Sequence, residues 1–396
     1  MSNQQSLLLQ ARVRNTPNGW KIKTVGEACL IRNDLRKPIS VEERDKINGE
    51  YPYYGPTGIL GYINQYLAEG CFALIGEDGD HFLKYESKDQ TLLVKGRFNV
   101  NNHAHLIGAT KECTVEWFYH FFKHRNIKSF LSRQGAGRYK LNKDTLQRLP
   151  ILLPPLTEQI AITDLLSTWD HIFEKAERLI AAKEKRYVCL VSRLIANDRH
   201  YRGRIRNFTT EISKRNNGAA IDRVLSVTNR NGFVLPEDQF ERCVASSDLS
   251  NYKIVTSRQY AYNPSRINVG SIARLDGWDS GVLSPMYVVF EIDDKKVNPD
   301  FFLHWLSSHE AKGRIRRSAQ GSVRETVSFK DLGAIPFPLP KMDLQKSIAK
   351  ILNTARQEID ILKKQAAAYR KQKRGLMQKL LTGYWRVKAT KELGNG

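Results

Sequence analysis

The chain has 396 residues, and its 63 lysines and arginines outnumber its 41 aspartates and glutamates, which gives a formal net charge of +22. This length corresponds to two or three domains, and a hydrophobic fraction of 41% excludes a largely disordered chain. The positive charge favours a polyanionic partner, with nucleic acid ahead of an anionic membrane surface. An inert basic surface is the alternative.

The five cysteines are dispersed and include no C-x-x-C pair. This pattern argues against both a disulfide framework and a zinc ribbon. No stretch approaches 18 apolar residues, and the N-terminal run of three leucines is too short for a signal peptide. We therefore expect a cytoplasmic protein that has no metal site and does not cross a membrane.

The first half of the chain predicts a mixed domain followed by a long helix. Short β-like runs at 20–25, 61–63, 71–75 and 91–94 are separated by turn signals, and residues 115–131 have a helical pattern. Prolines within 150–155 end this domain, and Thr157 is a candidate N-cap for the next helix. There, apolar or long-stemmed residues are spaced alternately by four and three, which is typical of a coiled coil. The predicted pairing stripe is Leu165, Trp169, Ile172, Ala176, Leu179, Lys183, Arg186, Leu190 and Leu194.

The second half of the chain has the same order of elements. Strands are expected at 253–256, 258–262 and 286–292, and a helix at 300–317. Asp343 is then a candidate N-cap of a second long helix, which Thr382-Gly383 should end. Its predicted pairing stripe is Leu352, Ala355, Ile359, Leu362, Ala366, Tyr369, Lys373, Leu376 and Leu380.

A fixed offset of 186 residues relates 132–195 to 318–381. Ser132-x-Gln134-Gly135-x-x-Arg138 corresponds to Ser318-x-Gln320-Gly321-x-x-Arg324, and Gln159 corresponds to Gln345. So long a period indicates a duplicated domain and helix rather than a solenoid. We predict an α+β fold with two globular domains separated by two long antiparallel helices, which form an intrachain coiled coil with a pseudo-two-fold internal repeat. The predicted limits are 1–152 and 201–338 for the globular domains, 153–200 and 339–386 for the helical connectors, and 387–396 for a tail.

Motifs that carry catalytic chemistry are mostly absent. The sequence has no P-loop and no glycine-rich dinucleotide fingerprint. Asn263-Pro264-Ser265-Arg266 lacks the second proline and the aromatic residue of an adenine methyltransferase element, so a turn or a DNA-facing loop is favoured. The acidic residues in 77–80 could hold Mg²⁺, and His103 and His105 could bind a metal, but an acidic turn and a hydrogen-bonded strand edge are favoured. We therefore predict no catalytic residue.

The recurring glycine–arginine segments and the loops rich in Asn, Arg and Tyr are candidate DNA contacts. Glycine lets the backbone approach a phosphate, and arginine binds phosphate or guanine. For any single residue, ordinary loop chemistry is the alternative. The predicted DNA-binding residues are Tyr53, Tyr54, Thr57, Arg133, Gln134, Gly135, Arg138, Lys140, Asn263, Ser265, Arg266, Asn268, Arg316, Arg317, Gln320, Gly321 and Arg324.

Several segments carry a resemblance to a known family. Both repeats contain related segments, Leu153-Pro154-Pro155-Leu156-Thr157-Glu158-Gln159 and Pro338-Leu339-Pro340-Lys341-Met342-Asp343-Leu344-Gln345, and the last helix ends in Lys373-Arg374-Gly375-Leu376-Met377-Gln378-Lys379-Leu380-Leu381-Thr382-Gly383. From about residue 20 onward the chain resembles the DNA-specificity subunit of a type I restriction–modification system. Residues 51–58, 75–79 and 101–105 resemble one class of its target-recognition domain, and 263–270 with 284–285 resemble another. Leu344 departs from the family, which usually has Glu there.

The resemblance implies a non-catalytic subunit that reads a bipartite, asymmetric double-stranded DNA target through two recognition domains. Its helices would dock two methyltransferase subunits that carry S-adenosylmethionine and, in a system that also restricts DNA, two restriction subunits that use ATP and Mg²⁺. The chain itself would hold no cofactor. A stand-alone DNA nuclease or methyltransferase, and a coiled-coil scaffold without a DNA role, are the alternatives. The residues expected in docking or in the coiled coil are Leu165, Trp169, Ile172, Leu179, Leu190, Leu352, Ile359, Leu362, Tyr369 and Leu376.

Overall fold

The computed structural model describes residues 15–133, 139–195, 200–229, 231–236, 248–320 and 326–387, with only the backbone described at Gln320. The chain divides into two units: the first joins 1–175 to 366–396, and the second is 176–365. The two boundaries between the units fall inside the two long helices. The predicted limits instead treat each helix as a separate connector, so these limits stay a prediction. No helix in the described ranges is both long and apolar enough to cross a membrane.

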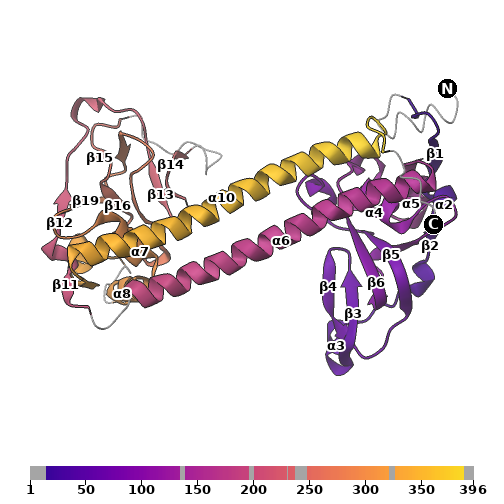
Figure 1. Cartoon of the computed structure of the whole chain (residues 1–396), viewed down its shortest axis with the longest axis horizontal. Helices are drawn as coiled ribbons and strands as arrows, with labels where there is room; N and C mark the ends of the chain where they lie inside the picture. Colours follow the sequence, from indigo (N-terminus) through magenta and orange to yellow (C-terminus); the bar gives the residue numbers. More distant parts are fainter. Residues whose placement is uncertain are drawn as a thin grey trace, which may run out of the picture. The chain divides into compact units, whose positions relative to one another are not determined.

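The first unit is built on a six-stranded sheet (Figure 1). Its strand order is β2-β7-β5-β6-β3-β4, and only β3 and β6 are parallel. Side chains alternate between the faces: Ala73 and Ile75 pack with helix α4 (Val115–Phe122) in one core, and Leu74 lies in the core of the other face. The strands are β2 (Leu30–Ile31), β3 (Asn48–Gly55), β4 (Gly58–Ile63), β5 (Ala68–Gly76), β6 (Thr91–Val100) and β7 (Ala104–Gly108).

The second unit has a smaller four-stranded sheet of order β12-β19-β16-β17, whose paired strands are all antiparallel. The helix expected at 300–317 is two helices, α7 (Pro299–Ser307) and α8 (His309–Gln320). Ser308 separates them because its backbone is extended (φ −70°, ψ 154°) and its Oγ accepts a hydrogen bond from Ala311 N. The strands of this sheet are β12 (Thr209–Ile212), β16 (Tyr260–Tyr262), β17 (Ile272–Arg274) and β19 (Val288–Ile292). Two two-stranded sheets accompany it, β13 (Ser226–Thr228) with β14 (Gly232–Val234) and β15 (Lys253–Thr256) with β18 (Ser280–Leu283).

Shorter elements complete the two units, and the predicted α+β class is confirmed. The helix expected at 115–131 ends at Phe122, and only a 3-10 turn follows it at η3 (Lys128–Phe130). The other short helices and turns are α2 (Val25–Ala28), η1 (Asn33–Leu35), α3 (Val41–Lys46), η2 (Asp80–Lys84), α5 (Lys143–Arg148), η4 (Ile205–Asn207), η5 (Asn217–Ala219), η7 (Ile267–Val269) and α9 (Phe329–Ala334). The remaining strands are β1 (Lys21–Thr24), β8 (Ser132–Arg133), β9 (Tyr139–Lys140), β10 (Pro150–Leu153), β11 (Arg202–Arg204) and β20 (Pro336–Pro338).

The two long helices are α6 (Leu156–Ile195) and α10 (Met342–Leu381), each of 40 residues. They pair antiparallel within each unit. In the first unit the ring of Trp169 meets that of Tyr369 at 6.1 Å. In the second unit Lys183 Nζ lies 2.5 Å from Glu358 Oε1 and the Arg356 guanidinium lies 5.8 Å from the ring centre of Tyr187, so positions rise along α6 as they fall along α10. The intrachain antiparallel pair is therefore confirmed (Figure 1).

The predicted pairing stripe is confirmed on α10 and wrong by one residue on half of α6. On α10, Leu352 and Ile359 are buried and Leu362 and Leu376 are half-buried, while Tyr369 packs on Trp169 although it is 40% exposed. On α6, Leu165, Ile172 and Leu179 are 38, 41 and 44% exposed, whereas Trp169 and Leu190 are half-buried as predicted. The residues that turn inward are the next ones along the chain: Leu166, Phe173, Ile180 and Tyr187. The four-three spacing fits either set, because apolar residues are adjacent at these positions.

The ends of the long helices follow the proline and glycine signals only in part. Thr157 and Asp343 lie inside the first turn rather than at the N-cap, because α6 and α10 begin at Leu156 and Met342. The end of α10 is as predicted: Gly383 has a φ of +71° and its N–H donates to Leu380 O at 3.1 Å.

The duplicated glutamines make the same three hydrogen bonds in each unit. Gln159 Oε1 accepts from Thr114 N at 3.0 Å, and Gln159 Nε2 donates to Glu112 O at 2.7 Å and Pro154 O at 2.9 Å. Both glutamines are buried. They join the first turn of each long helix to the N-cap of the domain helix, Thr114 for α4 and Asn298 for α7. The bonds of Gln345 are with Asn298 N (2.8 Å), Lys296 O (3.3 Å) and Pro340 O (2.8 Å).

A duplicated histidine contacts the long helices differently in the two units. His304 Nε2 bonds Asn353 Oδ1 at 2.8 Å and His304 Nδ1 bonds Tyr187 OH at 2.8 Å. In the first unit His120 occupies the corresponding place, and burial lowers its pKa to about 3. The position that corresponds to Tyr187 carries Lys373, which pairs with Asp170 instead.

Asp170 is the centre of a charge cluster, which we define as Asp89, Lys123, Asp170 and Lys373; the two lysines are buried, Asp170 is half-buried and Asp89 is exposed. Lys123 Nζ lies 3.4 Å from Asp170 Oδ1 and 3.2 Å from Asp89 Oδ2, and both lysines are buried. Burial by itself raises the pKa of Asp170, but the charges of Lys123 and then Lys373 outweigh it and hold that pKa below its usual value. Burial and the charge of Lys123 lower the pKa of Lys373. In the first unit, ion pairs between side chains therefore join the C-terminal end of α4 to α6 and α10.

Candidate nucleic-acid interface

Equivalent strands of the two units end at equivalent polar edges. In the first unit, Leu141 N donates to Glu77 O at 2.7 Å, just after β5. In the second unit, Val327 N donates to Pro264 O at 3.1 Å, just after β16. Leu141 and Val327 are 186 residues apart, the offset of the sequence repeat. The chain that follows each recurring glycine–arginine segment is thus held at the same edge in both units.

The next residue in each repeat fixes this edge further. Asn142 Oδ1 accepts from Thr145 N at 2.8 Å and caps α5, and Ser328 Oγ accepts from Asp331 N at 3.2 Å and caps α9. The segments that carry Gln134, Gly135 and Arg138, and Gly321 and Arg324, lie outside the described residues, as does the side chain of Gln320.

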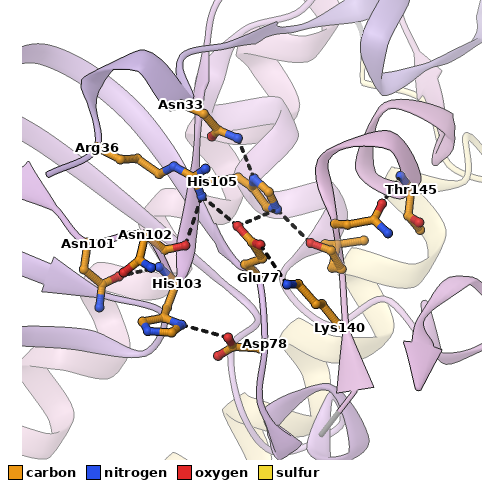
Figure 2. Close-up of polar contacts among 12 residues, drawn as sticks. Asn33, Arg36, Glu77, Asp78, Asn101, Asn102, His103, His105, Lys140 and Thr145 are labelled. Carbon is orange, nitrogen blue, oxygen red and sulfur yellow. Dashed lines mark hydrogen bonds and ion pairs between the residues drawn. The ribbon is translucent and has the colours of Figure 1, made fainter. Parts of the chain in front are cut away.

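At the first-unit edge, Glu77 forms ion pairs with Arg36 and Lys140 (Figure 2). Its carboxylate oxygens lie 2.7 Å from Arg36 Nη1 and 3.6 Å from Lys140 Nζ. Buried His105 bonds Asn33 Nδ2 through Nδ1 at 2.9 Å and Leu141 O through Nε2 at 2.7 Å. A carbonyl only accepts, so Nε2 carries the proton and Nδ1 accepts from the Asn33 amide. Burial lowers the pKa of His105, which agrees with this neutral form.

These contacts account for the acidic and histidine motifs of the sequence. Glu77 is neutralised by Arg36 and Lys140, and Asp78 Oδ2 lies 2.7 Å from His103 Nδ1. The described ranges contain no group of three or more His, Cys, Asp or Glu side chains arranged to hold a metal ion. The prediction that His105 is a hydrogen-bonded strand residue is confirmed, since its ring bonds Leu141 O; its strand β7, however, lies between β2 and β5 and is not an edge.

The other first-unit candidates divide into buried and accessible residues. Tyr53 is only 1% exposed, and its hydroxyl donates to Lys37 O at 2.8 Å and accepts from Ile39 N at 3.0 Å. Tyr53 is therefore a core residue, and its prediction as a DNA contact is wrong. Tyr54 is half-buried, and Thr57 and Arg133 are exposed, with the Arg133 guanidinium 5.3 Å from the ring centre of Tyr139.

The second-unit candidates come together at the corresponding edge. Asn263 Oδ1 accepts from Ser265 N at 3.0 Å, so the segment is a turn, as predicted. Ser265 and Arg266 are exposed, while Asn263 and Asn268 are half-buried. Helix α8 packs against η7, which follows this turn.

Helix α8 presents a basic face to solvent at this edge. Ala311, Ile315 and Ala319 are buried against the core, whereas Arg316 and Arg317 are exposed. In the described part of the corresponding stretch, the first unit has the short turn η3 and the two-residue strand β8 in place of a helix. The two edges therefore share a backbone frame but carry different side chains.

Sequence reasoning missed Arg36 as part of the edge and did not place Asn102 or His103 among the DNA contacts. Arg36 lies far from the motifs in sequence and reaches Glu77 only through the fold. Asn102 and His103 belong to the 101–105 segment that carried the family resemblance, which was the signal available for them.

Comparisons with known proteins agree with this architecture. The family model "Type I restriction modification DNA specificity domain" matches residues 17–183 and 260–368. A putative type I restriction enzyme specificity subunit of Haemophilus influenzae is 36% identical over 144 residues, which is 36% of each chain. A putative MjaX specificity subunit of Methanocaldococcus jannaschii is 24% identical over 423 residues, which is 96% of each chain.

A solved structure shows the same fold. The crystal structure of a type I restriction–modification S subunit from M. genitalium has a TM-score of 0.63 at 15% identity, covering 93% of this chain and 97% of the other. The family match spans both repeats and well over half of the chain. The chain thus belongs to the family of type I restriction–modification DNA specificity subunits.

Proposed function

We propose that each unit reads one part of a bipartite double-stranded DNA target, and that the polar edges described above are the reading surfaces. The observation that carries this proposal is the duplicated frame, in which Leu141 N and Val327 N bond equivalent carbonyls. The side chains on the two frames differ, with Asp78 and His103 on one and Arg266 and Arg316 on the other. Different side chains select different bases, so the expected target is asymmetric.

We assign the chemistry to partner subunits in the cytoplasm. Two methyltransferase subunits with S-adenosylmethionine would methylate adenine, and restriction subunits with ATP and Mg²⁺ would translocate and cleave DNA. Within the first unit, helix α6 leaves Leu165 and Ile172 exposed at a spacing of seven residues, which is an apolar stripe suited to a partner helix.

The first test is a genome-wide map of methylated adenines in cells with this gene present and deleted. We expect one two-part, non-palindromic motif to lose methylation on deletion. A map that does not change would contradict the proposal. Activity of the purified chain alone with Mg²⁺ or S-adenosylmethionine would instead favour a stand-alone enzyme, and partner binding without any DNA affinity would favour a scaffold.

The exposed arginines of α8 should bind phosphates. The double variant R316A/R317A is expected to weaken binding to duplexes of every sequence alike, because phosphate binding carries no base information. The slope of log K against log salt should become shallower by about 0.9 for each phosphate that is no longer neutralised. Fluorescence anisotropy over a salt series measures both effects. Lys371→Ala, at an exposed cation of α10, is the control, and equal slopes for R316A/R317A and wild type would contradict the expectation.

A further inference from the structure

The turn at 101–103 fixes the backbone of His103 on both sides. His103 N donates to Asn101 Oδ1 at 2.9 Å, and His103 O accepts from Glu77 N at 2.7 Å. Asn101 is itself buried, and its N–H donates to Tyr54 O at 2.9 Å. The turn is thus tied to the end of β5 and, through Tyr54, to β3.

The imidazole of His103 is held as well as its backbone. Nδ1 lies 2.7 Å from Asp78 Oδ2, and because an ionised carboxylate only accepts, Nδ1 must carry a proton. The other ring nitrogen, Nε2, lies on the far side of the ring from Asp78 (Figure 2), and the side chain is 51% exposed. The fold therefore presents one nitrogen of a fixed ring to the surroundings of the edge.

The neighbouring cations at this edge are engaged elsewhere. Arg36 and Lys140 both lie against Glu77, with Arg36 at 2.7 Å. Arg36 Nη1 also donates to Asn102 O at 3.0 Å, which fixes the residue before His103. Long, mobile cationic side chains are suited to contact phosphates. A ring nitrogen held at a defined place is suited to hydrogen-bond a base edge, because base recognition requires a defined geometry. Because the ring is already held in place before DNA binds, the loss of conformational entropy on binding is smaller.

We propose that His103 is a base-reading residue of the first unit and that Asp78 is its positioning residue. This inference rests on the proposed function. The ligand is a base edge of double-stranded DNA: neutral Nε2 accepts a hydrogen bond from an exocyclic amino group, and protonated Nε2 donates one to a purine acceptor. Glu77, Asp78 and Asn101 form the supporting contacts that set the position of the ring.

The test compares methylated-adenine maps from cells that carry the wild-type gene or a single variant. In the His103→Ala strain, we expect one position of one half-site to lose about tenfold in its preference for a base, while the spacer and the other half-site stay unchanged. Asp78→Ala should relax the same position. Asp78→Asn, whose amide oxygen still accepts from Nδ1, should stay closer to wild type. His171→Ala removes an exposed histidine of α6 in the same unit and is the matched control.

The outcomes separate this inference from the proposed function. A wild-type map without a two-part motif contradicts the proposed function itself. A wild-type motif that His103→Ala leaves unchanged overturns only the role of His103. A uniform loss of methylation at all sites also overturns it, because that result marks a phosphate contact or a structural role. Relaxation at one position by both His103→Ala and Asp78→Ala, with recovery in Asp78→Asn, supports base reading and positioning.

Discussion

Replacing Gln159 with alanine is expected to lower the free energy of unfolding of the first unit by about 3 kcal/mol or more. The buried side chain makes three hydrogen bonds, and its removal leaves Thr114 N, Glu112 O and Pro154 O without it. A buried backbone group left unsatisfied costs about 1–3 kcal/mol. Urea unfolding followed by tryptophan fluorescence measures the effect, since Trp20 and Trp117 both lie in the core of this unit.

Matched variants make this expectation specific to the buried bonds. Gln345→Ala should cost the second unit a similar amount, because Gln345 makes the same three bonds. Gln372→Ala, at an exposed position of α10, should change stability by no more than about 0.5 kcal/mol. Equal midpoints for Gln159→Ala and Gln372→Ala would refute the structural role given to the buried glutamine.

Replacing Asp170 with leucine should destabilise the first unit by about 3–5 kcal/mol, because it leaves a buried lysine pair without its shared carboxylate. Lys123 keeps Asp89 at 3.2 Å, so Lys373 should account for most of the cost. The double variant D170L/K373M should recover part of the stability, since it removes both partners. Thermal unfolding of the single and double variants measures this difference, and Asp164→Asn, at an exposed position of α6, is the control.

The contribution of Asp170 should also depend on pH. Because the folded state lowers the pKa of this carboxyl, its stabilising contribution is complete above the unfolded value of about 3.9 and is lost as the pH falls through the lower folded pKa. The stability difference between wild type and Asp170→Leu should therefore be constant near neutral pH and shrink below about pH 4. A constant difference down to pH 2 would show that Asp170 contributes through packing rather than charge.

The four-three spacing and the internal repeat made the architecture predictable. Apolar residues that are neighbours in the sequence of α6 limited the prediction of its inward face. The four-three spacing predicted both long helices and the repeat predicted their antiparallel pairing, which the contacts of Lys183 with Glu358 and of Tyr187 with Arg356 confirm. Neither could choose between Leu165 and Leu166 as the inward residue, because the four-three spacing fits both. That choice depends on what the helix packs against, which is tertiary information.

The sequence could indicate candidate residues that lie close together in the chain. It could not indicate contacts between residues that are far apart in the chain and meet only in the fold. Arg266 was expected from its loop and Arg316 from the basic residues before the second glycine–arginine segment, and both are exposed in the structure. Tyr53 was misassigned because an aromatic residue in a turn-rich segment can be either a core residue or a contact, and only its bonds to Lys37 O and Ile39 N distinguish them. Arg36 and Glu77 lie 41 residues apart and meet only in the folded sheet.

The duplicated glutamines bond only main-chain atoms of their neighbours, two carbonyls and one amide in each unit. Main-chain atoms are the same whatever the side chains, so this junction is indifferent to the sequence of the domain it holds. A domain of different sequence can therefore keep these three bonds to the long helix, although its other side-chain contacts with the helices change. Inherited diversity can then accumulate in what is read, while the framework that holds the readers stays constant.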